Sequence, residues 1–320
     1  MILRNTCVFI GLAFLASHSK ADIITDINAD GGVDTRAFAV LYEGGSGNQL
    51  HISGTAETIN GNIGIGGTGT IKLNGSGTLN GTVDFSSPYN GTPGSQCSSD
   101  SSFNFSCSSA NYPNYPTNPN PYDKNVSADL NGVATFSSNV ASIASGAPSE
   151  TITSGQTFYV NSTTANCTSY AGNCVVNVNP LTFSSSAGST IVINSQVAGA
   201  NVILNFTTSS DVQINGNITY AGFITSPDQL AINVTGGGGL KIVDATINGD
   251  YIDPNGSIFV SGSTLNGRIF GGDNSGMSLV SGVNINAATP EPAAIVLVVT
   301  VMLGLLPLLR RKLKRAAPSA

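Results

Sequence analysis

The sequence of 320 residues has no tryptophan and only two histidines, and charged side chains make up 9% of it. Ordinary globular domains contain about 25% charged residues. Basic residues are especially scarce between positions 22 and 289, where five Lys and Arg face 17 Asp and Glu. Binding to nucleic acid needs clustered Lys and Arg, so we expect no nucleic-acid partner.

Recognisable catalytic motifs are also missing. A nucleophilic site needs a base that is held by partner groups, and nothing around His51 in NQLHISG supplies them, so we interpret His51 as a strand-surface residue. Aspartates that could converge in space are scattered through the second half of the chain: Asp211, Asp228, Asp244, Asp250, Asp253 and Asp273. We therefore predict a protein that is not an enzyme and needs no cofactor, with a polysaccharide-active β-helix enzyme as an alternative.

Long apolar runs occur only at the two ends. Residues 1–21 contain Arg4, an apolar run and small residues before position 22, which is typical of a secretory signal peptide. Residues 293–309 carry no charge and are just long enough to cross a bilayer core. Arg310 and Arg311 begin a basic cluster behind them, which predicts a transmembrane helix with its C-terminal end on the cytoplasmic side.

Pro290-Glu291-Pro292 stands directly before this apolar segment. The order of Pro-Glu-Pro, hydrophobic span and Arg-rich end resembles the PEP-CTERM sorting signal of Gram-negative bacteria, here over 290–315. The resemblance implies recognition by an exosortase, a membrane protease-transpeptidase, and a stay in the inner membrane before processing. It also implies that the protein ends at the cell surface or outside the cell. A plain tail anchor is the other interpretation.

Four cysteines remain in the body, in two local pairs. An exported protein sits in a compartment where disulfides form. Local pairing, the simplest of three connectivities, joins Cys97 to Cys107 and Cys167 to Cys174. The spacings match no zinc pattern.

A short phrase recurs in the body, with an apolar residue, Asn-Gly, one variable residue and a second apolar residue. It occurs in TINGNIGI, TLNGTVDF, QINGNITY, TINGDYI and TLNGRIF. Alternation around Asn-Gly predicts β-structure, and Asn-Gly is typical of a tight turn. Neighbouring phrases are 18 or 20 residues apart, which favours the stacked coils of a β-solenoid over an antiparallel sandwich. Ile59, Leu79, Ile214, Ile247 and Leu265 are then expected to stack in its core.

The middle of the body departs from this pattern. Residues 96–121 form a Ser-, Asn- and Pro-rich loop that contains the first cysteine pair. Over 126–145, apolar residues recur at helical spacing, which predicts one amphipathic helix along the solenoid. The predicted fold is therefore mainly β: an irregular β-solenoid over 22–289 with one flanking helix.

Two further segments carry a resemblance. FAVLYEGGSGNQLHISGTAETINGNIGIGGTGTI and GSIFVSGSTLNGRIFGGDNSGMSLVSGVNI resemble the opening and closing coils of bacterial ice-binding-type and choice-of-anchor-A adhesin-like domains. The resemblance implies an irregular β-solenoid with a helix packed alongside. It also implies a structural or adhesive surface protein of the envelope, matrix or biofilm, with extracellular polysaccharide as an expected partner.

Two site hypotheses follow. DINADGGVD places Asp26, Asn28, Asp30 and Asp34 at positions 1, 3, 5 and 9 of a calcium-type loop, but position 12 is alanine, so a solvated turn is the alternative. Ice binding, the alternative function, needs a flat array of hydroxyl groups in register. The Thr-x-Thr steps Thr68/Thr70 and Thr151/Thr153 do not repeat at the coil period.

Overall fold

The computed structural model describes residues 22–45, 48–87, 97–99, 125–146, 148–161, 166–272 and 276–287, with 97–99 as backbone only. The chain divides into two compact units, 1–288 and 289–320, and all described residues belong to the first. The predicted signal peptide, the sorting signal and nearly all of the 96–121 loop, with Cys107, lie outside the described residues. Within the described ranges, no helix is long and apolar enough to span a bilayer.

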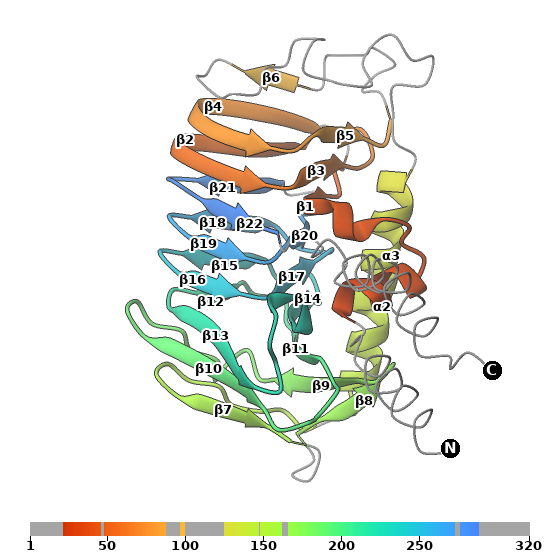
Figure 1. The fold of residues 1–320 in the computed structure, drawn as a ribbon, viewed down its shortest axis with the longest axis vertical. Coiled ribbons are helices and arrows are strands. Elements are labelled where there is room, and N and C mark those ends of the chain that lie inside the picture. The colour runs from red at the N-terminus through yellow and green to blue at the C-terminus, as the bar shows by residue number, and fades with distance from the viewer. Residues whose placement is uncertain are drawn as a thin grey trace, which may run out of the picture. The chain divides into compact units, whose positions relative to one another are not determined.

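The body is a β-solenoid whose coils stack along one axis, and each full coil contributes a strand to three faces (Figure 1). Among the described strands, every pair is parallel except β8 with β9. This confirms the solenoid and excludes the antiparallel sandwich. Buried Ile, Leu and Val side chains from all three faces fill one continuous core.

The first face is a nine-stranded sheet, which we call the helix-covered face. In spatial order it consists of β5 (Val83–Phe85), β3 (Asn62–Ile65), β1 (Phe38–Tyr42), β20 (Ile269–Gly271), β17 (Asp250–Asp253), β14 (Leu230–Thr235), β11 (Val202–Thr207), β9 (Asn173–Val178) and β8 (Thr168–Tyr170).

The other two faces form one 13-stranded sheet, because the long strands β2 (Gln49–Asn60) and β4 (Thr70–Asn80) run across both. The Lys/His face, named for its outward Lys241, His51 and Lys72, contains β12 (Val212–Ile214), β15 (Leu240–Val243), β18 (Ile258–Ser261), β21 (Met277–Val280), the first halves of β2 and β4, and β6 (Cys97–Ser99). The third face contains β7 (Thr157–Val160), β10 (Thr190–Ser195), β13 (Asn217–Gly222), β16 (Thr246–Asn248), β19 (Thr264–Asn266), β22 (Asn284–Asn286) and the second halves of β2 and β4.

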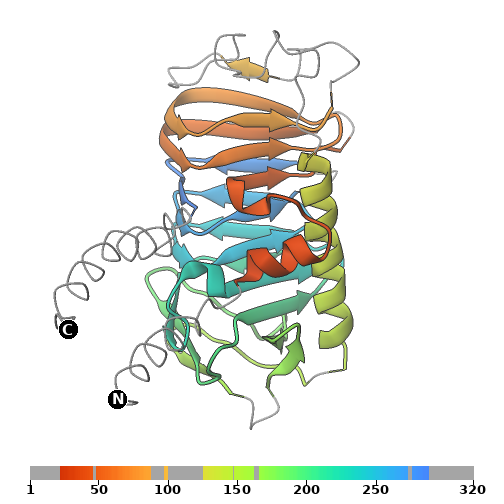
Figure 2. The ribbon, with the colours of Figure 1, turned by 45° about the vertical axis from the view of Figure 1, so that its right-hand side comes forward.

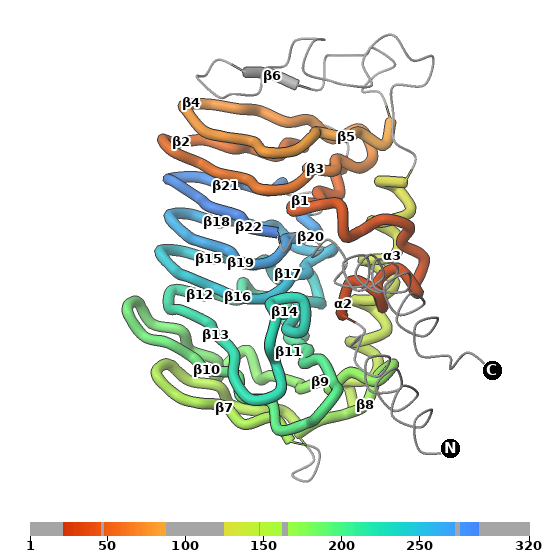
Figure 3. The backbone as a smooth tube through the Cα atoms, in the orientation of Figure 1, coloured from red at the N-terminus to blue at the C-terminus, as the bar shows by residue number. Residues whose placement is uncertain are grey.

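The coils do not stack in chain order. Strand β1 pairs with β20 on one side and β3 on the other, and β2 pairs with β21 and β22. The N-terminal coils therefore stack on the last C-terminal coil, as the backbone trace shows (Figure 3). Helix α3 (Asn125–Ala144) then runs along the solenoid to its other end, where the next coils begin (Figure 2).

Two α-helices pack on the helix-covered face. The longer, α3, matches the predicted helix with its start one residue earlier, and its apolar stripe packs on buried residues of β1, β9, β11, β14, β17 and β20. The shorter, α2 (Ile23–Ala29), was not predicted, and its three isoleucines join the same cluster. Two 3-10 turns, η1 (Thr35–Ala37) and η4 (Pro227–Gln229), precede β1 and β14.

The Asn-Gly phrase marks a corner between coil faces. At Gly267, φ is 148° and an added Cβ would lie 2.0 Å from the carbonyl oxygen of Gly249 in the next coil. Only glycine fits this close approach. Ile59, Leu79, Ile247 and Leu265 stack as expected, but Ile214 pairs with Ile242 on the Lys/His face. In the stack on the third face, Ile218 pairs with Ile247 in the position that was predicted for Ile214. The Asn-Gly of QING follows a strand of the Lys/His face, so it turns the chain at a different corner of the coil.

Candidate functional site

The third face carries two rows of small polar side chains on five adjacent strands. Strand order along the axis is β16, β19, β22, β2 and β4, with residue-for-residue parallel register at these positions. Each strand presents an outward, inward, outward triplet, since side chains alternate between the faces of a sheet. The outward residues are Thr246, Thr264, Asn284, Thr58 and Thr78 in one row and Asn248, Asn266, Asn286, Asn60 and Asn80 in the other. We call this surface the Thr/Asn face.

Hydrogen bonds between side chains hold the asparagine row in order. Along the ladder each Nδ2 donates to the next Oδ1: Asn80 to Asn60 at 2.7 Å, Asn60 to Asn286 at 2.7 Å, Asn286 to Asn266 at 3.1 Å and Asn266 to Asn248 at 3.0 Å. At the last rung, Asn248 donates to the carbonyl oxygen of Ile218 at 2.9 Å. The ladder crosses the junction between the N-terminal and C-terminal coils, so it fixes their relative register as well.

The other row, which consists of four threonines and Asn284, lies beside this ladder. Between the two rows, the inward Ile and Leu side chains stack in the core of the solenoid. We call this second row the threonine row. Leu265, between Thr264 and Asn266, is fully buried, whereas Thr264 is half-buried and Thr246 exposed. Adjacent strands are about 4.8 Å apart, and outward residues on one strand are about 6.6 Å apart. The hydroxyl groups of one row and the amide groups of the other thus form an array with two regular spacings.

The array was not among the sequence predictions, which considered only Thr-x-Thr steps. The signal was Thr-x-Asn, which stands in the Asn-Gly phrase itself, as in TIN and TLN. Thr68 lies in a turn after β3 and Thr70 at the start of β4 on the Lys/His face, while Thr151 and Thr153 precede β7. These two steps are not part of the array.

The predicted calcium ligands point to separate partners. Asp26 and Asn28 lie inside α2, where Asp26 accepts a hydrogen bond from Asn173 and Asn28 one from the backbone of Thr35. Asp30 accepts hydrogen bonds from the Tyr170 hydroxyl at 2.7 Å and from Asn139. Burial and this bond to Asp30 raise the pKa of Tyr170 to about 12.

Asp34 is the N-cap of η1, and its backbone N–H donates to Asp129 of α3. In the described part of the chain, no group of three or more His, Cys, Asp or Glu side chains is arranged to hold a metal ion. The calcium loop stays a sequence hypothesis that this arrangement does not favour.

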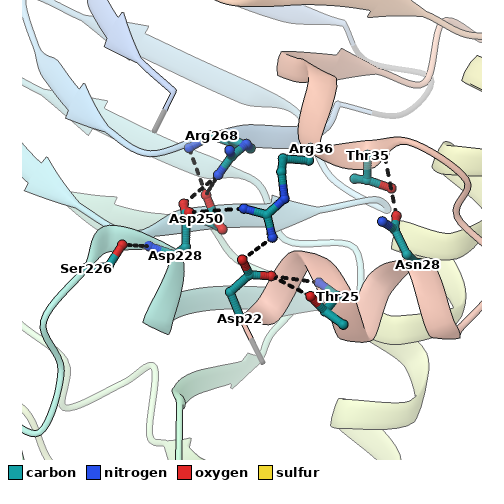
Figure 4. A network of polar contacts seen from close by, with 9 residues as sticks. All are labelled: Asp22, Thr25, Asn28, Thr35, Arg36, Ser226, Asp228, Asp250 and Arg268. Atoms are coloured by element: carbon teal, nitrogen blue, oxygen red, sulfur yellow. Dashed lines mark hydrogen bonds and ion pairs between the residues drawn. The ribbon is translucent and has the colours of Figure 1, made fainter. Parts of the chain in front are cut away.

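Charged side chains do converge around the buried Arg268 (Figure 4). Arg268 is fully buried and contacts Asp228 at 2.5 Å and Asp250 at 3.6 Å. Arg36 links Asp228 to Asp22, the N-cap of α2. Burial raises the pKa of Asp250 to about 7, with a further contribution from the charge of Asp228, against the opposing effect of Arg268. The cluster anchors α2 to the coils.

The remaining sequence-predicted residues that the structure describes lie apart from the Thr/Asn face. Cys167 and Cys174 form the predicted disulfide, with Cα atoms 5.1 Å apart, across the β8–β9 hairpin. His51 is on the Lys/His face, half-buried, with Nε2 3.2 Å from Asn74 Nδ2. The sorting residues Pro290, Glu291, Pro292, Arg310 and Arg311 lie outside the described ranges, as does the partner predicted for Cys97.

No protein-family model and no curated protein sequence matches the chain. Several solved structures do. An ice-binding protein from an Antarctic biological consortium is 15% identical, with 79% of this chain and 89% of that chain covered at a TM-score of 0.41. An ice-binding protein from the Antarctic ascomycete Antarctomyces psychrotrophicus is 12% identical, with coverages of 83% and 98% and a TM-score of 0.40. An ice-binding protein from an Arctic yeast is 14% identical, with coverages of 82% and 97% and a TM-score of 0.36.

Proposed function

We propose that this chain is an exported surface protein that attaches to ice through the Thr/Asn face. The observation that carries the proposal is the pair of Thr and Asn rows on five strands in register. The hydroxyl and amide groups stand at two regular spacings, so they can order water molecules over many positions at once. Such binding needs rigidity more than strong single contacts, since each ordered group would otherwise lose conformational entropy on binding.

The asparagine ladder supports this proposal. Because amides already bond to one another along the axis, they are held in place before any ligand arrives. The threonine methyl groups add apolar area between the hydroxyls, which favours release of disordered surface water. Helices α2 and α3 cover a different face, so they leave this surface open.

Surface display is the second part of the proposal. It is supported by the sequence of the two ends: a secretory signal over 1–21 and a PEP-CTERM-like segment over 290–315. We infer export, a temporary stay in the inner membrane of a Gram-negative bacterium, and processing by an exosortase. Displayed at the surface, an ice-binding face would give the chain an adhesive role, which unites the structural or adhesive interpretation with the ice-binding one.

The test is incorporation of the purified, fluorescently labelled protein into a slowly growing ice hemisphere. Thr264→Tyr and Thr58→Tyr each place a bulky ring in the middle of the array, and we expect incorporation to fall to the level of a protein that does not bind ice. Ser278→Tyr makes the same change at an outward position of the Lys/His face and should leave incorporation unchanged. Equal incorporation of all three variants would remove the assignment of this face.

A further inference from the structure

A polar cavity lies at one end of the Lys/His face, away from the Thr/Asn face. Its volume is about 250 Å³, and its lining comes from the β9–β10 loop and from β12 with its flanking residues. The lining includes Phe183, Ser184, Ser186, Asp211, Gln213 and Asn215. Ligand sites for larger molecules start at about 300 Å³, so this cavity suits one small ring.

A sheet edge forms one wall of the cavity. Strand β12 is the terminal strand of the Lys/His face among the described strands and pairs only with β15. The N–H of Val212 donates to Gly239 on the β15 side. Backbone groups alternate in direction along a strand, so the N–H and C=O of Gln213 point to the opposite, cavity side. An edge strand presents such groups to a ligand.

The opposite wall is a fixed loop. Ser186 donates its N–H to Ser154 Oγ at 2.7 Å, and Ser184 donates its N–H to the carbonyl of Ile152 at 3.1 Å. Ser185 joins the loop to the corner after β12, where its Oγ accepts from Gly216 N–H at 2.9 Å. The loop is thus held to the coils on both sides, and its conformation is set before a ligand binds.

The combination of side chains indicates the ligand. Asp211 supplies acceptors only, whereas the amides of Gln213 and Asn215 and the hydroxyls of Ser184 and Ser186 supply donors and acceptors. Phe183, which contacts Phe206 edge-on at a centroid distance of 5.0 Å, adds an apolar element. A sugar ring has both properties, with hydroxyls that donate and accept around an apolar C–H face.

We propose that this cavity binds a single neutral hexose unit of a polysaccharide. The carboxylate of Asp211 disfavours an acidic sugar, and a three-residue edge gives little length for an extended peptide. The site is independent of the Thr/Asn face. It would let one displayed protein hold a matrix polymer and an ice surface at the same time.

Saturation-transfer NMR on the purified protein tests this, with the methyl glycosides of glucose, galactose and mannose as probes. We expect transfer to at least one of them. Asp211→Asn combined with Gln213→Ala should weaken its binding by about thirtyfold, because two lost hydrogen bonds at about 1 kcal/mol each amount to about 2 kcal/mol. Ser186→Tyr fills the cavity and should abolish transfer.

Lys241→Gln is the matched control, since Lys241 is the register partner of Gln213 on the next strand but does not line the cavity. It should leave transfer unchanged. The proposal is overturned by absence of transfer to all three glycosides, or by equal transfer in wild type and cavity variants. Transfer to a triserine peptide in place of the glycosides would also overturn it, because the β12 edge would then be a peptide site.

Discussion

Single residues in this protein are held by their neighbours in the adjacent coils more than by neighbours in sequence. Asn266 bonds to Asn248 and Asn286, which lie 18 and 20 residues away. Position 267 must be glycine, because a Cβ there would clash with the carbonyl oxygen of Gly249 in the next coil. Arg268, the following residue, is buried because Asp228 and Asp250 reach it from other coils. These three consecutive residues thus contribute a ladder hydrogen bond, a close backbone approach and a buried ion pair. Each contribution depends on a residue in a neighbouring coil.

The buried carboxyl group of Asp250 predicts a pH dependence of stability. Its pKa is about 7 in the folded protein against an ordinary value of 3.8. Between these values the unfolded chain has lost the proton and the folded protein still binds it, so this group makes the free energy of unfolding fall as pH rises from about 4 to 7. We expect Asp250→Asn to lack this component, so that wild type gains stability relative to the variant as pH is lowered.

Urea unfolding of both proteins at several pH values between 4 and 8 measures the difference. Asp244→Asn, at an exposed position, is the control substitution. A difference between wild type and Asp250→Asn that does not change with pH, or one in which wild type gains stability as pH rises, would contradict the expected sign.

Elements in this fold depend on close approach between backbones. Helix α3 contains Gly132, a residue that normally weakens a helix by about 1 kcal/mol relative to alanine. A Cβ at this position would lie 2.4 Å from the backbone nitrogen of Gly32 and 2.9 Å from the carbonyl oxygen of Ile27. The glycine therefore lets α3 pack directly against the segment that follows α2. Asp129, one turn earlier, accepts hydrogen bonds from Val33 and Asp34 in that segment.

Gly132→Ala should therefore destabilise the protein although it raises helix propensity. The added methyl group would contact backbone atoms, which cannot relax as easily as a side chain. Overpacking of this kind lowers the free energy of unfolding by about 1–3 kcal/mol. The measurement is the midpoint of urea unfolding. Ser138→Ala, at an exposed position of the same helix, should change stability by no more than about 0.5 kcal/mol. A stabilised Gly132→Ala variant would show that the helix is not packed this closely.

At the scale of the whole molecule, we propose separate roles for the ends of the chain and for its body. The first and last coils of the body belong to one stack, because the coils from 38–85 pack on the coil that ends near 286. The segment from 290 onward lies outside the described residues, and its sequence predicts a sorting address. Sorting and ice binding should accordingly be separable by mutation.

Replacement of Pro290-Glu291-Pro292 by three alanines should leave membrane insertion intact, since the apolar span and the basic end remain. Processing should fail, and full-length protein should accumulate in the inner membrane. Cell fractionation with immunoblotting of the producing bacterium measures both. Normal release of the body from this variant would contradict the interpretation of the tail as a sorting signal. Arg310 and Arg311 replaced by alanine form a second variant for the basic end of the signal.

The sequence by itself determined the fold class and the helix, because both depend on local periodicity. Asn-Gly at a spacing of 18 or 20 residues indicates a coil, and apolar residues at helical spacing indicate α3. The Cys167–Cys174 disulfide was also predictable, since the two cysteines are seven residues apart. Each of these features depends on residues within one short segment or on the spacing between similar segments.

Only the tertiary structure decided which coils are neighbours, and the candidate site depends on this. Thr58 lies next to Asn284, 226 residues away, because the last coil meets the first. The same stacking placed Ile214 on a different face from its sequence counterparts and buried Arg268 among three coils. A periodic sequence is compatible with many registers. The register is selected by contacts between distant segments: the asparagine ladder, the buried charges and the close approach of glycines.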